Sequence, residues 1–147
     1  MKLFNNNKLT RKQLRREVCI VAKSLGVNRV AFNNKAKFVC GSYNSKNKNI
    51  FIDTKQDKKD LLCTFFHELA HHTAVKNRKW LPYHTNPSTP NLTALRKFNI
   101  ENGIDKIART LWYKYVDTKV WGKYKYGYPK TQKQYLVNNF FKYFSKF

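Results

Sequence analysis

The stretch that decides the fold is residues 61–73, which read LLCTFFHELAHHT. Its apolar residues recur at helical spacing, and they predict a helix over about residues 57–76 with one buried side. Asp57 and Asp60 stand in the first turn of this helix, where negative charge is favourable. The sequence therefore predicts a helix that packs on the core through its apolar side and presents polar side chains on the other.

The pentapeptide His67-Glu68-Leu69-Ala70-His71 lies within this helix. Histidines at i and i+4 lie one turn apart on one face, so both imidazoles can bind the same metal ion. Glu68 projects beside the open position of such a metal, where it can take a proton from a bound water. Two of the four histidines and one of the eight acidic residues fall in these five positions. The interpretation we favour is a catalytic zinc site; the alternative is an accidental or decayed copy of the motif.

A catalytic zinc needs a third protein ligand. A second long helix is predicted from residue 91 or 92 to about residue 116, and it carries Glu101 and, one turn later, Asp105. We expect Glu101 to bind the metal and Asp105 to accept a hydrogen bond from a ligand histidine, which would orient its ring. The alternative is that both acids are solvated and pair with Lys97 or Arg109.

Other side chains compete for the metal. His84, in the proline-rich segment 77–90, is the main alternative third ligand, and either it or Tyr83 could instead stabilise a developing oxyanion. His72 points about 100° away from His71 around the helix and is not expected to share the metal. Cys63 lies one turn before the motif and could be a soft ligand, but a buried apolar role is the favoured interpretation.

The rest of the chain predicts a small α+β fold. Thr10 is expected to cap a basic helix that ends before Gly26, and residues 44–48 are typical of a hairpin turn. Cys40 is interpreted as strand core. The remaining predicted elements are a helix at 11–25, strands at 27–32, 37–43 and 49–53, and a helix at 131–147. We expect one domain over residues 1–118, with a basic, aromatic C-terminal helical extension over 119–147 packed on it.

Composition restricts the partners. The chain of 147 residues is 41% hydrophobic, with no run near the ~18 apolar residues of a membrane span. Its three cysteines are too few and too scattered for a disulfide framework, and no signal peptide is evident, so we expect a cytoplasmic protein. The net charge of +22, carried mostly by lysine, indicates non-specific attraction to nucleic-acid phosphates.

Aromatic residues alternate with lysines over residues 112–130. Such a segment can stack on single-stranded bases, but the favoured interpretation is that the aromatic rings fill the core.

The pentapeptide with a downstream Glu101-x-x-x-Asp105 resembles the zincin metallopeptidases of the glutamate-ligand kind. The strand–turn–strand–helix order ending at Thr73 is similar to the small zincins of bacteria, phages and mobile elements. Residues 64–73 are particularly similar to the zincin domain of ArdC-type antirestriction proteins and the ImmA/IrrE peptidases. The resemblance covers residues 37–116. SprT-like proteases share the layout, but their third ligand is a histidine, which would point to His84.

This resemblance implies a zincin-like domain that hydrolyses peptide bonds with Zn²⁺. Glu68 would accept a proton from the zinc-bound water and pass it to the leaving amine. A protein or peptide substrate would bind as an added strand at the sheet edge formed by the 37–53 hairpin. Combined with the charge, the resemblance suggests a nucleic-acid-associated protein as substrate, in a bacterial, phage or mobile-element setting.

Two alternatives remain open at the level of sequence. One is a nucleic-acid-binding or virion-associated protein that retains the zincin fold without catalysis, favoured by the charge and by the absence of further acidic residues around the site. The other is a structural zinc, which would need a fourth ligand such as Cys63 or His84 and whose removal would unfold the chain.

Overall fold

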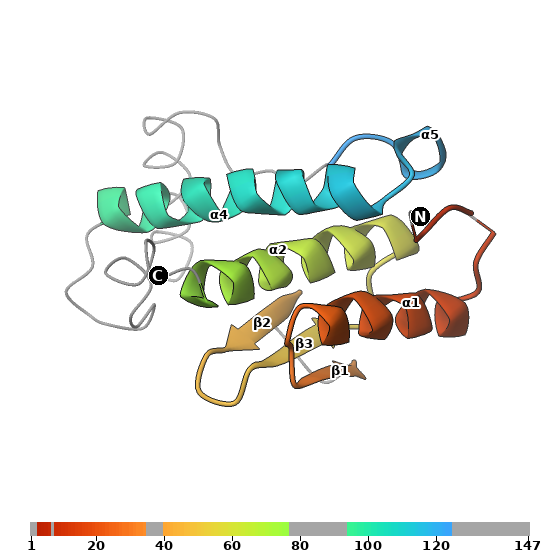
Figure 1. The fold of residues 1–147 in the computed structure, drawn as a ribbon, viewed down its shortest axis with the longest axis horizontal. Helices are drawn as coiled ribbons and strands as arrows, with labels where there is room; N and C mark the ends of the chain where they lie inside the picture. Colours follow the sequence, from red (N-terminus) through yellow and green to blue (C-terminus); the bar gives the residue numbers. More distant parts are fainter. Residues whose placement is uncertain (1–2, 7, 35–39, 77–93, 125–147) are drawn as a thin grey trace, which may run out of the picture.

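Four helices and a three-stranded sheet form the described part of the chain (Figure 1). The computed structural model describes residues 3–6, 8–34, 40–76 and 94–124, with side chains in the last range from residue 101 onward. The elements are α1 (Arg11–Ser24), β1 (Arg29–Asn33), β2 (Gly41–Asn44), β3 (Asn49–Asp53), α2 (Lys58–Lys76), α4 (Ala94–Tyr115) and α5 (Thr118–Trp121). The predicted α+β class is confirmed.

The sheet has the order β1-β3-β2, with β3 parallel to β1 and antiparallel to β2. Ile50 and Ile52 alternate with half-buried neighbours along β3 and are fully buried. The predicted hairpin of β2 and β3 is present. Of its two strands, β2 lies at an edge of the sheet and β3 is central, because β1 pairs with the other side of β3. Cys40 precedes β2 and is exposed, so its interpretation as strand core is wrong.

Helix α2 lies between the sheet and α4 (Figure 1). It contacts β2 and β3 on one side, α1 beside them, and α4 on the other. Every residue from Leu61 to Ala70 is buried, polar ones included. The sequence predicted one buried side, and this is incorrect because α4 covers the second side. The polar side chains of the motif therefore lie between two helices.

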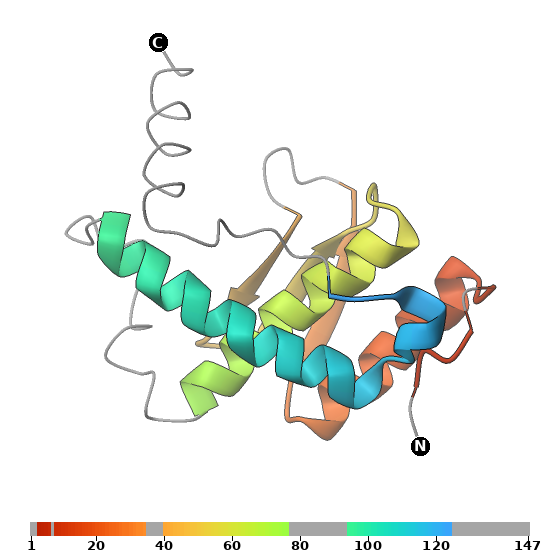
Figure 2. The same ribbon diagram turned by 90° about the horizontal axis from the view of Figure 1, so that it is seen from above.

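Helix α4 crosses over α2, as Figure 2 shows from above. Ile104, Ala108 and Trp112 recur at four-residue spacing along α4 and are fully buried. The Trp112 ring meets the edge of Phe66 from α2 at a centroid distance of 5.7 Å. This apolar stripe docks α4 on α2 and so determines where Glu101, nearly one turn before Ile104, lies.

The N-terminal residues pack against the C-terminal end of α4. Leu3 forms an isolated parallel β-bridge with Val116. The neighbouring Phe4 is fully buried against Phe66, and its backbone N–H donates to a carboxylate oxygen of Glu17 at 2.8 Å. The start of the chain thus completes the same core as α2 and α4.

Residues 118–124 continue this core beyond α4. Trp121 and Tyr124 are buried, and the indole N–H of Trp112 donates to the carbonyl of Gly122 at 3.0 Å. The core interpretation of the aromatic segment is confirmed for these three rings, whereas Tyr113 is exposed. The rest of the predicted extension, residues 125–147, lies outside the described part. Among the described residues, no helix is both long enough and apolar enough to cross a bilayer.

Candidate metal centre

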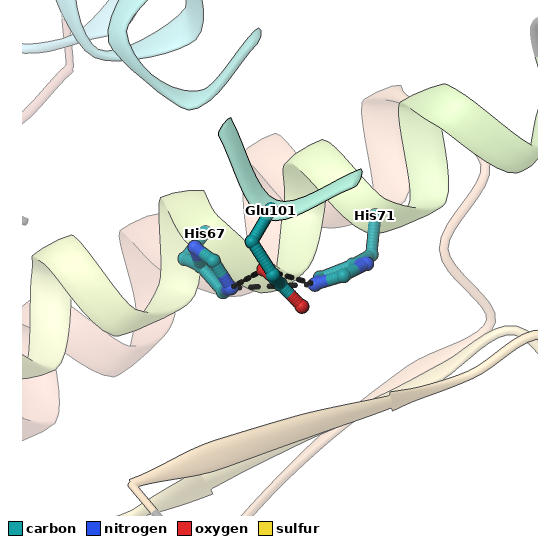
Figure 3. Close-up of side chains that lie close together, drawn as sticks. All are labelled: His67, His71 and Glu101. Carbon is teal, nitrogen blue, oxygen red and sulfur yellow. Dashed lines mark hydrogen bonds and ion pairs between the residues drawn. The ribbon is translucent and has the colours of Figure 1, made fainter. Parts of the chain in front are cut away.

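Three donor atoms converge between α2 and α4 (Figure 3). His67 and His71 extend from successive turns of α2, and their Nε2 atoms are 3.3 Å apart. Glu101 reaches them from α4, with its Oε2 atom 3.3 Å from Nε2 of His67 and 3.7 Å from Nε2 of His71. The two predicted histidines and the predicted glutamate are therefore brought together.

These distances fit a shared metal ion. Zinc binds histidine nitrogen and carboxylate oxygen at about 2.0–2.2 Å with tetrahedral geometry, which puts neighbouring donor atoms roughly 3.3–3.5 Å apart. Direct N–H···O hydrogen bonds are shorter, most often about 2.9–3.0 Å. Three polar atoms that are mutually 3.3–3.7 Å apart are long for hydrogen bonds and are spaced as the donor atoms around one metal ion would be.

Within the described ranges, the group contains three donors and no fourth. Cys63 is buried among core residues and does not belong to the group. His72 does not belong to the group of three donors either, as its position around the helix predicts. His84 and Tyr83, the predicted alternative ligand and oxyanion stabilisers, lie outside the described residues. Among the described residues, three donors could therefore hold one metal ion.

Glu68 is buried beside the three donors. Burial raises the pKa of its carboxyl group to about 7; the charge of His67 opposes this shift and that of Glu101 adds to it. A carboxyl group with a pKa near neutrality can both accept and release a proton at physiological pH.

The histidines lie in a strongly acidic environment. Burial lowers the pKa of His67, but the hydrogen bond to Glu101 and the charges of Glu68, Glu101 and Asp105 outweigh it, so the pKa is raised. Three of the chain's eight acidic residues thus gather around this site. The charge that these groups carry when ionised would favour a bound cation, although Asp105 is already paired with Arg109.

Asp105 is buried behind His67. One of its oxygens accepts from Nε of Arg109 at 2.9 Å, which is the i+4 pairing considered as the alternative to a metal-site role. Its other oxygen, Oδ1, is buried and has no hydrogen-bond partner among the described residues, while its charge raises the pKa of His67. Asp105 therefore pairs with Arg109 without being solvated, and its role in orienting His67 stays a prediction.

The rim of the site is formed by the start of β2. A Cβ atom on Gly41 would lie 2.6 Å from Cγ2 of Thr64, 2.9 Å from the carbonyl of Phe51 and 3.4 Å from Cγ of Glu68. The backbone of the edge strand can approach the glutamate this closely only because residue 41 has no side chain.

Gln56 ties this strand to α2. Its side-chain oxygen accepts from the Thr64 hydroxyl at 2.8 Å. Its side-chain nitrogen donates to the carbonyls of Cys40 at 3.0 Å and Asp53 at 2.8 Å. No role was predicted from the sequence for Gly41, Gln56 or Thr64. The available signal was weak, because it consisted only of Gly41, one of five glycines, at the start of the strand nearest the motif.

Replacement of Gly41 by Ala is expected to destabilise the protein by about 1–3 kcal/mol, because the added methyl group overlaps Thr64 and a backbone carbonyl. In thermal unfolding this corresponds to a decrease in Tm of roughly 2–4 °C per kcal/mol for a chain of this size. Ser42→Ala, at the exposed neighbouring position, is the control and should leave Tm unchanged. A Tm for Gly41→Ala equal to that of wild type would mean that the edge strand is not held against Thr64.

Comparison of the chain with protein-family models, curated proteins and solved structures found no match. The functional argument therefore depends on the geometry and chemistry of the site.

Proposed function

We propose that the protein is a zinc-dependent peptidase in which His67, His71 and Glu101 hold the metal and Glu68 is the general base. The observation that carries the proposal is the mutual spacing of the three donor atoms, 3.3–3.7 Å, beside a buried carboxyl group. Two imidazoles and one carboxylate are a donor set that suits catalytic zinc.

Zinc bound here supplies a Lewis acid that polarises a carbonyl group and makes water more acidic. The residues of the chain then handle the proton. Glu68 accepts it from the attacking water and delivers it to the nitrogen of the leaving amine, for which a pKa of about 7 is suitable. The charge of Asp105 acts on His67, and Asp105 is proposed to orient the His67 ring when the metal is bound.

The proposed substrate is an extended peptide. Strand β2 pairs with β3 on one side and, within the described residues, has no strand on the other. Its start is next to Glu68 at Gly41. A peptide that added to this edge would gain main-chain hydrogen bonds with little demand on its sequence, and its backbone would pass close to the base.

We further propose that the substrate is associated with nucleic acid. Lysine and arginine exceed acidic residues by 30 to 8, and three of those eight acids are at the metal centre. The remaining surface is therefore even more positive than the net charge of +22 suggests. Such a surface concentrates the protein on phosphate backbones without selecting a base sequence.

The second candidate function is a non-catalytic nucleic-acid-binding protein, and the same charge favours it. It gives no reason for two histidines and three acidic residues to gather in a buried site. A bound cation accounts for that grouping, and we therefore place the peptidase first.

Metal removal and reconstitution test the proposal. We expect about one zinc per chain by elemental analysis, and cleavage of a proteome-derived peptide library, detected by mass spectrometry, that stops with 1,10-phenanthroline and returns with equimolar Zn²⁺. The absence of zinc even after reconstitution would exclude the enzyme. Stoichiometric zinc with no cleavage of the library would instead favour the binding protein.

A further inference from the structure

A second candidate site lies beside the last turns of α2, where His72 directly follows His71 in sequence but takes no part in the group of three donors. The end of α1, the β2–β3 turn and the last turns of α2 meet on one side of the molecule (Figure 1) and enclose a pocket of about 260 Å³. The pocket is lined by Gly26, Tyr43, Lys48, His72, Val75 and Lys76.

His72 forms the floor of this pocket and is held on both ring nitrogens. Its Nε2 lies 2.8 Å from the carbonyl of Leu25, to which it can only donate. Nδ1 of the neutral ring is therefore an acceptor, and the Tyr43 hydroxyl donates to it at 2.7 Å. The side chain is 3% exposed. Both groups are thus fixed in place, with the phenol oxygen left able to accept a further hydrogen bond.

The charge in the pocket is positive and uncompensated. Lys48 and Lys76 line it, and neither forms an ion pair with any described residue. None of the eight carboxylates of the chain lines it. Both lysines are exposed and line the same pocket as the buried His72, whose Nδ1 accepts a hydrogen bond. The pocket therefore presents two positive charges beside a side chain that carries none.

Gly26 lines the pocket without a side chain. Its φ of +87° is one that glycine adopts at little cost. A Cβ atom there would lie 3.6 Å from Nζ of Lys76 and 3.7 Å from Nε2 of His72. The Lys76 ammonium group is thus next to the imidazole, at the pocket.

We propose that this pocket binds a phosphate group of a nucleotide. Lysine ammonium groups are compact point charges that suit a phosphate. The volume exceeds that of a phosphate alone, and Val75 with the Tyr43 ring supplies an apolar wall for the attached sugar. The phosphate comes either from a free mononucleotide or from a nucleic-acid strand. The inference is independent of the proposed peptidase, because no metal ligand takes part.

The test is a titration followed by ¹H–¹⁵N NMR at 150 mM salt, with inorganic phosphate, thymidine 5′-monophosphate and decathymidylate as separate probes. The amide of Gly26 is the reporter, because it lies at the pocket and glycines are few. We expect it to shift with at least one probe. Tighter binding of the monophosphate would identify a free nucleotide as the ligand, and tighter binding of decathymidylate would identify a strand.

Matched charge variants separate the pocket from the general positive surface. The double variant Lys48→Ala/Lys76→Ala is expected to lose at least tenfold in affinity. Lys46→Ala/Lys23→Ala removes the same charge from exposed positions in the same turn and on α1, and should lose less than twofold. Equal losses in the two double variants, or no shift of Gly26 with any probe, would overturn the proposal. Glu101→Ala should leave phosphate binding unchanged, so the two proposals fail separately.

Discussion

Replacement of Glu68 by Gln is expected to lower the rate of peptide cleavage by about 10²–10⁴-fold, the usual contribution of a general acid–base group. The amide has nearly the same shape as the carboxylate but cannot take a proton from water. It leaves His67, His71 and Glu101 in place, so zinc should stay near one per chain. The measurement is kcat/KM on a peptide identified from the library, together with zinc content.

Asp60→Asn is the matched control for this variant. Asp60 lies in the first turn of the same helix, is exposed, and loses the same charge in the same type of substitution. Its activity should stay within twofold of wild type. Glu68→Gln retaining more than a tenth of wild-type activity would remove Glu68 from the role of base.

The metal-free protein offers a check that Glu68→Gln folds. Because burial raises the folded-state pKa of Glu68 to about 7, the folded protein binds a proton more tightly than the unfolded chain. The contribution of Glu68 to the free energy of unfolding is complete below pH ~4.5 and is lost as the pH rises towards 7 and above, where the buried carboxyl group must ionise. Glutamine does not ionise and therefore does not lose this stability. With a chelator present, the variant should therefore have a higher Tm than wild type at pH 8, and the difference should shrink towards pH 5.

Replacement of Glu101 by Ala is expected to weaken zinc binding by more than about 100-fold. Loss of a residue that only orients a ligand costs about 10–100-fold, and a ligand contributes more than its supporting partner. Among the described residues, Glu101 is also the only member of the candidate site on α4, so His67 and His71 alone of the three donors would remain. Competition with a fluorescent zinc chelator measures the change.

His84→Ala is the comparison that identifies the third ligand. If Glu101 is the ligand, zinc affinity should stay within twofold of wild type in His84→Ala. Zinc loss in His84→Ala, with binding retained in Glu101→Ala, would show a three-histidine site of the SprT-like kind. Asp60→Ala serves as the control for a lost surface carboxylate.

The parts of the structure that the sequence predicted well depend on local spacing. Thr10 caps α1 in a capping box with Gln13, as a Thr before a helical pattern indicates. His67 and His71 are four residues apart, so any helix places them together. Glu101 required one further assumption, that α4 docks with its apolar stripe on α2, and the buried Ile104, Ala108 and Trp112 satisfy it.

Other features depend on contacts between distant segments, which spacing does not reveal. The parallel pairing of β1 with β3 makes β3 the central strand and leaves β2 as the hairpin strand at an edge of the sheet. Two contacts join residues that are far apart in sequence. Gly41 approaches Glu68, 27 positions later, and Tyr43 forms a hydrogen bond with His72, 29 positions later. Asp105 was placed on the correct face of its helix, but its pairing with Arg109 competes with the predicted contact to a histidine.

The bridge between Leu3 and Val116 affects the order in which the centre can be completed during synthesis. Phe4 precedes α2 and α4 in the chain, yet its ring is buried beside a bridge to a residue more than 100 positions later. During synthesis this ring can be buried only after the end of α4 has emerged. Helix α2 can form earlier with both histidines, whereas Glu101 joins them only when α4 docks on α2. A metal ion that bound before that point would meet only the two histidines.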